Sequence, residues 1–330
     1  MSKWVSALLI AGCVGLLAAC SDGSSDEFDT GPRSSSPVAT ATPVELVPVG
    51  TLAPVQSVRP ANWVYWLSDI NLTEIAGLSP EVVVIDYSQD GGPDSEFSRS
   101  DITGLRDAMS DPGLVISYMS IGEAESYRYY WQSAWTSDKP GWPEKENPNW
   151  EGNYKVRYWD PEWQSIILGS ASSYLDRIIA AGFDGVYLDI IDAYDYFAEQ
   201  GRETAEDEMV AFVSAISQYA KLKRPGFLIF PQNAPELGAR SDYMAVVDGI
   251  GMEGVYFGWE EPNRRTSAAD TTWLEEQLAR FIDAGRTVLA VDYASGKDDV
   301  ADAYRLSRAH GFTPTVTDVD LAGLPYPELD

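Results

Sequence analysis

Short apolar runs alternate with amphipathic stretches along most of the chain after residue 62. A short apolar run bounded by turn residues is typical of a buried strand, and apolar residues at every third or fourth position are typical of a helix. This pattern predicts eight strands, at Trp63–Leu67, Val82–Tyr87, Leu114–Ser120, Gly185–Asp189, Phe227–Pro231, Gly249–Glu253, Thr287–Asp292 and Phe312–Thr317. It predicts helices between most of them, at Ile102–Ser110, Pro161–Ala181, Ala205–Lys223, Pro235–Val246, Thr271–Ala284 and Asp298–Ala309.

Eight strands joined by crossover helices predict an α/β fold, and specifically a closed (β/α)8 TIM barrel covering residues 62–325. The main rival is an open, doubly wound sheet. Such a sheet ordinarily carries a glycine-rich phosphate-binding turn after its first strand. Here that position holds Leu67, Ser68 and Asp69, which favours the barrel.

Residues 1–61 have a different pattern from the barrel region. Lys3 precedes an apolar run that ends in Ala18, Ala19 and Cys20, which predicts a signal peptide over residues 1–19. The sequence before Cys20 also resembles a bacterial lipobox, so we expect lipidation of Cys20 and export to the bacterial cell envelope. An ordinary cleaved leader, with no role for Cys20, is the alternative. Residues 20–61 are rich in Ser, Thr and Pro and predict a disordered tether.

The composition removes several kinds of chemistry. Both cysteines, Cys13 and Cys20, lie in the leader region, and His310 is the only histidine. These counts exclude Cys-His catalysis in the mature domain and any zinc site made of several histidines, and they leave His310 as the single histidine that Ser-His catalysis could use. We therefore expect catalysis by carboxylates, with no cofactor and no metal.

The formal net charge is −28, which repels nucleic acid and anionic lipid. This charge favours a neutral or cationic partner, although solubility of an exported protein is an equally good explanation. We expect an amino-sugar polysaccharide as substrate, a monomeric protein, and membrane contact through the lipid anchor only.

Acidic and amide residues end most of the predicted strands, and active sites of such barrels lie at that end. For a single residue of this kind, capping of a helix N-terminus is the more ordinary role. The repetition around the barrel favours a binding site. The residues concerned are Asp86, Glu123, Asp189, Asp192, Asn233, Glu253 and Asp292.

Alternation along two strands selects a candidate catalytic pair. In the fourth strand Tyr187 and Asp189 share one face, and in the sixth Glu253 shares its face with Gly249 and Gly251. Strands two apart lie roughly 10 Å from each other. Side-chain reach can close this gap to about 5–5.5 Å, which suits a retaining glycosidase, or leave the wider gap of an inverting one.

Aromatic residues near the same strand ends suit a carbohydrate cleft, because sugars present apolar C–H faces to flat rings. We expect substrate contacts from Trp66, Tyr87, Tyr187 and Tyr256. The connection between Tyr127 and Trp159 is too long for a simple loop and predicts a lid or a cleft wall.

Four segments together resemble glycoside hydrolase family 114 over roughly residues 62–322. They are Tyr118–Glu125, Trp150–Trp159, Gly182–Phe197 and Asn233–Glu236. The resemblance implies a (β/α)8 barrel and endo-α-1,4-polygalactosaminidase activity on partly deacetylated galactosamine polymers. It maps the catalytic pair onto Asp189 and Glu253. By analogy with barrel α-glycosidases, Asp189 is the nucleophile and Glu253 the general acid/base.

Two other functions stay open at this stage. The first is a chitinase-like hydrolase of another amino-sugar polymer, but the acid-rich run of that class is absent because Asp189 is followed by Ile190, Ile191 and Asp192. The second is a non-catalytic polysaccharide-binding lipoprotein, which the presence of both candidate carboxylates disfavours.

Overall fold

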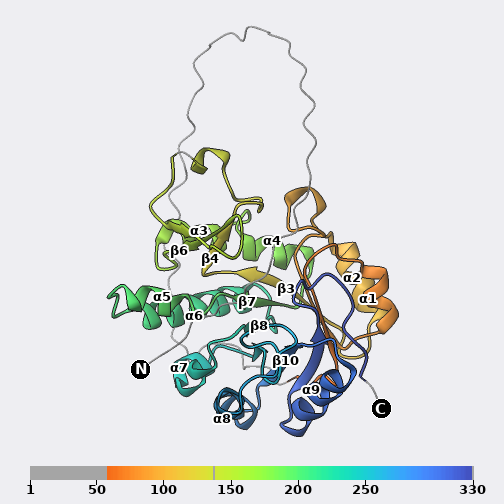
Figure 1. Cartoon of the computed structure of the whole chain (residues 1–330). Helices are drawn as coiled ribbons and strands as arrows, with labels where there is room; N and C mark the ends of the chain where they lie inside the picture. The colour runs from red at the N-terminus through yellow and green to blue at the C-terminus, as the bar shows by residue number, and fades with distance from the viewer. Residues whose placement is uncertain (1–57, 137, 329–330) are drawn as a thin grey trace, which may run out of the picture.

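The computed structural model describes residues 58–136 and 138–328 (Figure 1). Eight of its strands belong to the predicted barrel: β1 (Trp63–Trp66), β2 (Val82–Ile85), β3 (Leu114–Ser120), β7 (Gly185–Asp189), β8 (Leu228–Pro231), β9 (Gly249–Glu253), β10 (Thr287–Tyr293) and β11 (Thr313–Thr317). The α-helices are α1 (Leu72–Leu78), α2 (Arg99–Ala108), α3 (Pro161–Ile167), α4 (Tyr174–Ala181), α5 (Ala193–Glu199), α6 (Ala205–Lys223), α7 (Ser241–Met244), α8 (Ala268–Asp283) and α9 (Lys297–Ala309).

All eight barrel strands run parallel to their neighbours, in two sheets of order β1-β2-β3-β7-β8 and β11-β10-β9. A parallel bridge between Gln232 and Gly251 joins the two sheets after β8. At the other seam the described residues form no ladder, but the Trp63 indole donates to the Thr313 carbonyl at 3.0 Å. The (β/α)8 fold is confirmed, with an incomplete hydrogen-bonded ring.

Two apolar cores follow from strand alternation. In β1, Trp63 and Tyr65 join the core inside the barrel, while Val64 and Trp66 join the larger core between strands and helices. Gly251 is required by the inner core, because a Cβ at this position would meet the Tyr187 hydroxyl at 1.8 Å. Glycine in β9 therefore makes room for a tyrosine of β7.

The helices cover the outside of the barrel; α1 and α5 were not predicted, α2, α8 and α9 have bounds up to three residues from those expected, and two predicted helices are divided. The predicted helix Pro161–Ala181 is two helices, α3 and α4, separated by a turn in which Gly169 has φ +112°. The segment Pro235–Val246 forms a 3-10 turn, η4 (Pro235–Ala239), followed by the single turn of α7. In contrast, α6 has the predicted bounds.

A small antiparallel sheet is inserted after β3, in the order β4-β6-β5. Its strands are β4 (Glu123–Glu125), β5 (Pro143–Glu146) and β6 (Asn153–Val156), with a short 3-10 helix, η3 (Ser133–Thr136), between β4 and β5. In Figure 1 this inserted sheet lies above β3 and β7, beside α3. Its apolar side chains join the outer core, so it is a fixed wall rather than an open loop.

The beginning of the described chain packs against the base of the barrel. The carbonyl of Pro60 accepts from the Thr313 hydroxyl at 2.8 Å, and the Ala61 amide donates to Glu81 at 2.8 Å. The predicted leader, Cys20 and the tether up to residue 57 lie outside the described residues. Within residues 58–136 and 138–328, no helix is long and apolar enough to span a bilayer.

Candidate active site

Asp189 ends β7 and is held by two donors. The Tyr118 hydroxyl donates to its Oδ2 at 2.6 Å, and the Ile190 amide donates to its Oδ1 at 2.7 Å. Ile190 has φ +59°, a conformation that is strained for a β-branched residue. The nearby Gly122 permits this turn, because a Cβ there would meet the Ile190 carbonyl at 2.1 Å. Such strain is typical of functional sites.

Glu253 ends β9 and is held in a similar way. The Asn233 side-chain amide donates to its Oε2 at 2.8 Å, and the Tyr293 hydroxyl donates to its Oε1. Asn233 and Ala234 both have left-handed backbones, at φ +61° and +49°, and Gly254 has φ +65°. The chain therefore turns sharply after both β8 and β9, which directs Asn233 toward Glu253.

The two carboxylates interact electrostatically inside the barrel mouth. The pKa of Asp189 is raised to about 8, mainly by burial and next by the charge of Glu253. The hydrogen bond from Tyr118 lowers this pKa, but by less than Glu253 raises it. Asp189 therefore holds a proton near neutral pH in the free protein. One ionised and one protonated carboxyl is the state that glycosidic cleavage requires.

Four inward-facing tyrosines surround the pair, namely Tyr65, Tyr118, Tyr187 and Tyr293. Burial and the nearby carboxylates raise the pKa of each well above its usual value, so all four stay protonated and can donate. The Tyr187 hydroxyl is buried and has no hydrogen-bond partner among the described residues. It lies against Gly251 in the core inside the barrel.

A buried arginine lies behind Tyr118. Arg128 donates to both oxygens of Glu125, at 2.6 and 3.0 Å, and to Asp86 at 2.7 Å. Its guanidinium lies over the rings of Tyr118 and Tyr127, at 5.9 and 5.0 Å from their centroids. Burial raises the pKa of Asp86 to about 6, although Arg128 opposes that shift.

Several predicted site residues do lie near the pair. Asn233 donates a hydrogen bond to Glu253. Asp86 binds Arg128, which lies over the ring of Tyr118, the donor to Asp189. The charge of Asp192 contributes to the raised pKa of Asp189. Glu123 lies on the inserted sheet, where it is buried against Asn147 and Lys155. These residues come from β2, β4, β8, β9 and the start of α5.

Four other predicted residues face away from the barrel mouth. Trp66 and Tyr87 pack in the outer core. The Tyr256 hydroxyl meets His310 Nδ1 at 3.0 Å, on the α9 side. Asp292 is buried and accepts from the backbone amides of Tyr256 and Phe257, at 2.7 and 2.8 Å. Trp66 and Asp292 belong to the outward sets of β1 and β10, and Tyr87 and Tyr256 lie beyond the ends of β2 and β9, so the structure does not bring these side chains to the pair.

The strand-end search missed three residues that shape the site. Tyr118 and Tyr293 lie on the inward faces of β3 and β10, and both donate to a candidate catalytic carboxylate. Strand alternation could have predicted Tyr118, because it shares a face of β3 with Ser120, the last residue of that strand. Arg128 comes three residues after Glu125. Its isolated positive charge in an acidic stretch was the available signal.

No group of three or more His, Cys, Asp or Glu residues in the described part of the chain is arranged to hold a metal ion. A surface hollow of about 600 Å³ lies between the loops that follow β1 and β2, and its lining includes Asp69, Gln89 and Glu96. Its lining does not include Asp189 or Glu253. Its acidic side chains lie at the same end of the barrel, where the strands end.

A parallel eight-stranded α/β barrel with two interacting carboxylates at its strand ends has the architecture of a barrel glycoside hydrolase. The sequence profile of glycoside-hydrolase family GH114 matches residues 49–327. The chain belongs to this family of O-glycosyl hydrolases.

Relatives with similar sequences extend over most of the chain. An uncharacterized protein of Thermotoga maritima is 35% identical over 273 residues, which are 79% of this chain and 81% of the relative. An uncharacterized protein of Deinococcus radiodurans is 37% identical over 306 residues, which are 91% of this chain and 93% of the relative. Both similarities therefore include the barrel.

Two solved structures share the fold. The glycoside hydrolase domain of PelA from Pseudomonas aeruginosa has a TM-score of 0.65 and 20% identity, covering 82% of this chain and all of that domain. Aspergillus fumigatus Ega3, in complex with galactosamine, has a TM-score of 0.60 and 17% identity, covering 84% of this chain and 97% of Ega3. At these identities the likeness shows the fold alone.

Proposed function

We propose that this chain is an endo-acting hydrolase that cleaves α-1,4 bonds in a partly deacetylated galactosamine polymer. The observation that carries the proposal is the Asp189–Glu253 pair at the carboxyl ends of β7 and β9. The two groups are electrostatically linked, and a tyrosine donates to each of them. Membership of family GH114 supports the reaction class.

In the proposed reaction Asp189 attacks the anomeric carbon while Glu253 donates its proton to the departing glycosidic oxygen. The C–O bond to the leaving sugar breaks as the bond to Asp189 forms, giving a covalent glycosyl–enzyme. Glu253, now ionised, takes a proton from water, and the resulting hydroxide attacks the same carbon and releases Asp189. The anomeric configuration is retained.

The hydrogen bonds favour this division of roles. The Ile190 backbone amide can only donate, so it permanently favours negative charge on Asp189. The partners of Glu253 are a tyrosine hydroxyl and a side-chain amide, both of which can also accept a hydrogen bond. In the free protein the raised pKa keeps a proton on Asp189, so the proposed roles require that this proton has left Asp189 and that Glu253 is protonated when the substrate is bound.

The charge at the barrel mouth suits an amino sugar. The charges of Glu253 and Asp192 both act on Asp189, and an ammonium group bound there would offset this repulsion. Tyr187, which is buried in the inner core, would form the floor of the site below the bound sugar. The galactosamine complex of Ega3, a protein with the same fold, is consistent with this substrate class.

The test is incubation of the purified protein with a defined α-1,4-galactosamine oligomer, followed by NMR of the products. We expect internal cleavage with retained configuration, and loss of cleavage in Asp189→Asn and Glu253→Gln. Asp292→Asn is the matched control, because this carboxyl binds backbone amides away from the pair. Cleavage of chitin oligomers alone would indicate a chitinase-like enzyme, and binding without products a binding protein.

We also propose that the chain is exported and held at the cell envelope by a lipid on Cys20. The basis is the leader pattern and the small residues before Cys20. Metabolic labelling with a radioactive fatty acid tests this directly. Cys20→Ala should lose the label and move to the soluble fraction, and an unlabelled wild-type chain would contradict the proposal.

A further inference from the structure

Two aromatic side chains at the rim of the barrel mouth are unusually exposed. Tyr127 follows β4 and is 46% exposed, and Trp150 lies in the β5–β6 turn and is 45% exposed. Large apolar or aromatic residues with such exposure are few among the described residues. Both belong to the inserted sheet and its turns, which separate β3 from α3.

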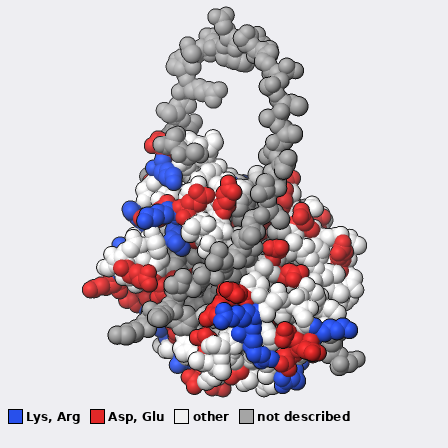
Figure 2. Space-filling view, in the orientation of Figure 1, with Lys and Arg blue, Asp and Glu red and all other residues white. Residues whose placement is uncertain are grey.

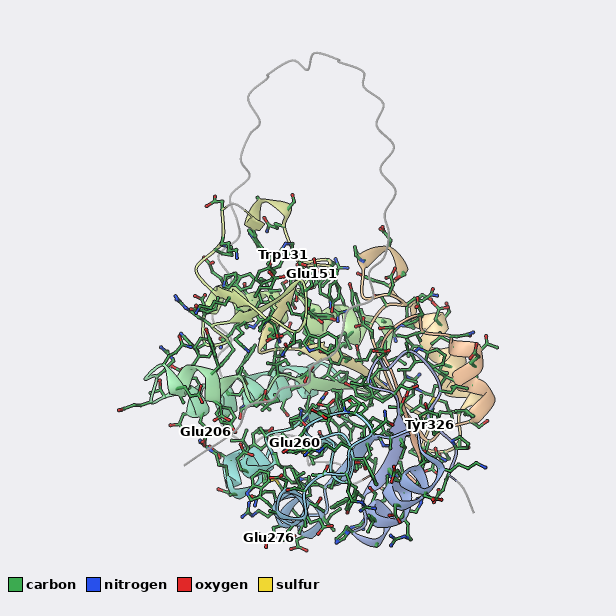
Figure 3. The ribbon with its side chains drawn as sticks, viewed as in Figure 1. Trp131, Glu151, Glu206, Glu260, Glu276 and Tyr326 are labelled. Atoms are coloured by element: carbon green, nitrogen blue, oxygen red, sulfur yellow. The ribbon has the colours of Figure 1, made fainter. Side chains whose placement is uncertain are left out.

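The turns that carry the two aromatics lie against each other. The Ser126 amide donates to the Gly152 carbonyl at 2.8 Å, and a Cβ on Gly152 would meet the Ser126 hydroxyl at 2.6 Å. Figure 3 labels Glu151, the neighbour of Trp150, close to Trp131 on the same part of the insertion. We call Tyr127 and Trp150 the rim platform.

Tyr127 is fixed in place although half of it faces solvent. Its hydroxyl donates to Glu125 at 2.6 Å, and its ring covers the Arg128 guanidinium at 5.0 Å. The ring also packs so closely on Gly91 that a Cβ there would lie 2.9 Å from it. A ring held this rigidly loses little conformational entropy when a ligand stacks on its open face.

A short series of contacts connects the platform to the candidate catalytic pair. Glu125, which holds Tyr127, also binds Arg128. Arg128 lies over the ring of Tyr118, whose hydroxyl donates to Asp189. The rim platform therefore lies on the same face of the barrel as the candidate catalytic pair. Sugars further along a bound polymer would pass over it.

We propose that the rim platform is a distal subsite that stacks on pyranose rings of the polymer, away from the bond being cleaved. This inference rests on the proposed polysaccharide substrate. Tyr127 and Trp150 would give the enzyme a preference for long polymers over short oligomers. The C–H faces of hexosamine units suit flat aromatic rings. The exposed Glu151 beside Trp150 would attract their ammonium groups.

Chain-length dependence provides the test. Tyr127→Ala and Trp150→Ala should each raise KM for a long galactosamine oligomer about 3- to 10-fold, while kcat/KM for the shortest cleavable oligomer stays unchanged. Leu222→Ala is the matched control, because Leu222 is 68% exposed on α6 but far along the chain from the platform. In the Asp189→Asn background, quenching of tryptophan fluorescence by the long oligomer should be weaker without Trp150.

Tyr127→Phe separates stacking from a purely structural role. It keeps the ring and removes the hydroxyl donor of Glu125, so we expect a lower Tm with KM for the long oligomer near the wild-type value. If Tyr127→Ala lowers Tm but leaves KM for long oligomers unchanged, and Trp150→Ala does the same, the platform is overturned and Tyr127 only shields Arg128. If the wild-type protein binds no galactosamine oligomer, the proposed function fails as well.

Discussion

At the scale of single residues, the site contains a carboxyl group, Asp189, whose ionised form is disfavoured by its surroundings. Asp189 is removed from water, faces the charge of Glu253, and is followed by a strained Ile190. Two donors compensate for only part of this cost. Groups arranged in this way are expected to contribute to catalysis at the expense of folding stability.

Asp189→Asn should therefore inactivate the enzyme and stabilise the fold. The pKa of Asp189 is raised to about 8 in the folded state, so the folded protein binds an extra proton between roughly pH 4 and 8. The free energy of unfolding of the wild type thus falls as pH rises through this window. We expect the free energy of unfolding of Asp189→Asn to exceed that of the wild type by several kcal/mol at pH 8 and to equal it near pH 4. Calorimetric unfolding at both pH values measures this, and a destabilised variant at pH 8 would contradict it.

The sequence proposed Asp189 and Glu253, which the structure places at inward strand ends, but it also proposed residues that face elsewhere, and the reason lies in strand burial. In β7 and β9, aromatic or glycine positions mark the inward face. In β10 every residue is buried, so no alternation distinguishes Asp292 from its inward neighbour Tyr293. Tyr256 lies beyond the end of β9, where alternation no longer applies. The positions of such side chains depend on the fold of the following turn.

Asp292 should prove structural rather than catalytic. Its carboxylate ties the turn after β9 to β10 by accepting two backbone amides, and burial raises its pKa to about 7. Asp292→Ala leaves both amides without a partner and should cost roughly 1–3 kcal/mol of stability. Asp292→Asn keeps an acceptor oxygen, so its Tm should stay near wild type. Urea unfolding and oligomer cleavage of both variants would check this, and loss of kcat in a stably folded Asp292→Asn would refute it.

At the scale of elements, the insertion after β3 completes one side of the site. In β4 the residue between the two glutamates, Ala124, packs in the core, while Glu123 and Glu125 face polar partners. The acidic face is neutralised by Lys155 and Arg128. The sequence predicted a wall here but not its strands, because β4 is only three residues long and its partner follows at a distance along the chain.

Arg128 should be the most important single residue of this insertion for stability. It is almost fully buried between Glu125 and Asp86, and its removal leaves two buried carboxylates without a cation. We expect Arg128→Met to lower the free energy of unfolding by roughly 3–5 kcal/mol. Arg177→Met is the control, since its pair with Glu96 is partly exposed and should contribute less than about 1 kcal/mol. Equal losses in the two variants, measured by urea unfolding, would disprove this role.

At the scale of the whole molecule, the fold could be predicted because repeated strand and helix periods agreed along the chain. The bounds of β3, β7, β9 and α6 follow directly from hydrophobic periodicity. The break between α3 and α4 was missed, although Gly169 and the serines that follow it are residues typical of a turn. What periodicity cannot give is contact between distant segments, such as Arg128 with Asp86, because it reports only local spacing.

Net charge is the remaining property of the whole chain that bears on function. The chain has 51 acidic and 23 basic residues, and Figure 2 shows groups of acidic side chains at several places on one face, with basic ones among them. The field of such a surface extends about 10 Å in 0.1 M salt and attracts a cationic polymer before any specific contact forms. If the charge serves the substrate, association must weaken as salt increases.

We therefore expect kcat/KM for a deacetylated galactosamine polymer to fall about 10-fold between roughly 0.05 and 0.5 M NaCl. The loss should appear mainly in KM, because screening weakens the encounter and leaves the buried Asp189–Glu253 pair little affected. A largely acetylated polymer of the same length is the control, since it is nearly neutral and its kcat/KM should barely change. Equal salt dependence for the two polymers would mean that the −28 charge serves solubility rather than substrate attraction.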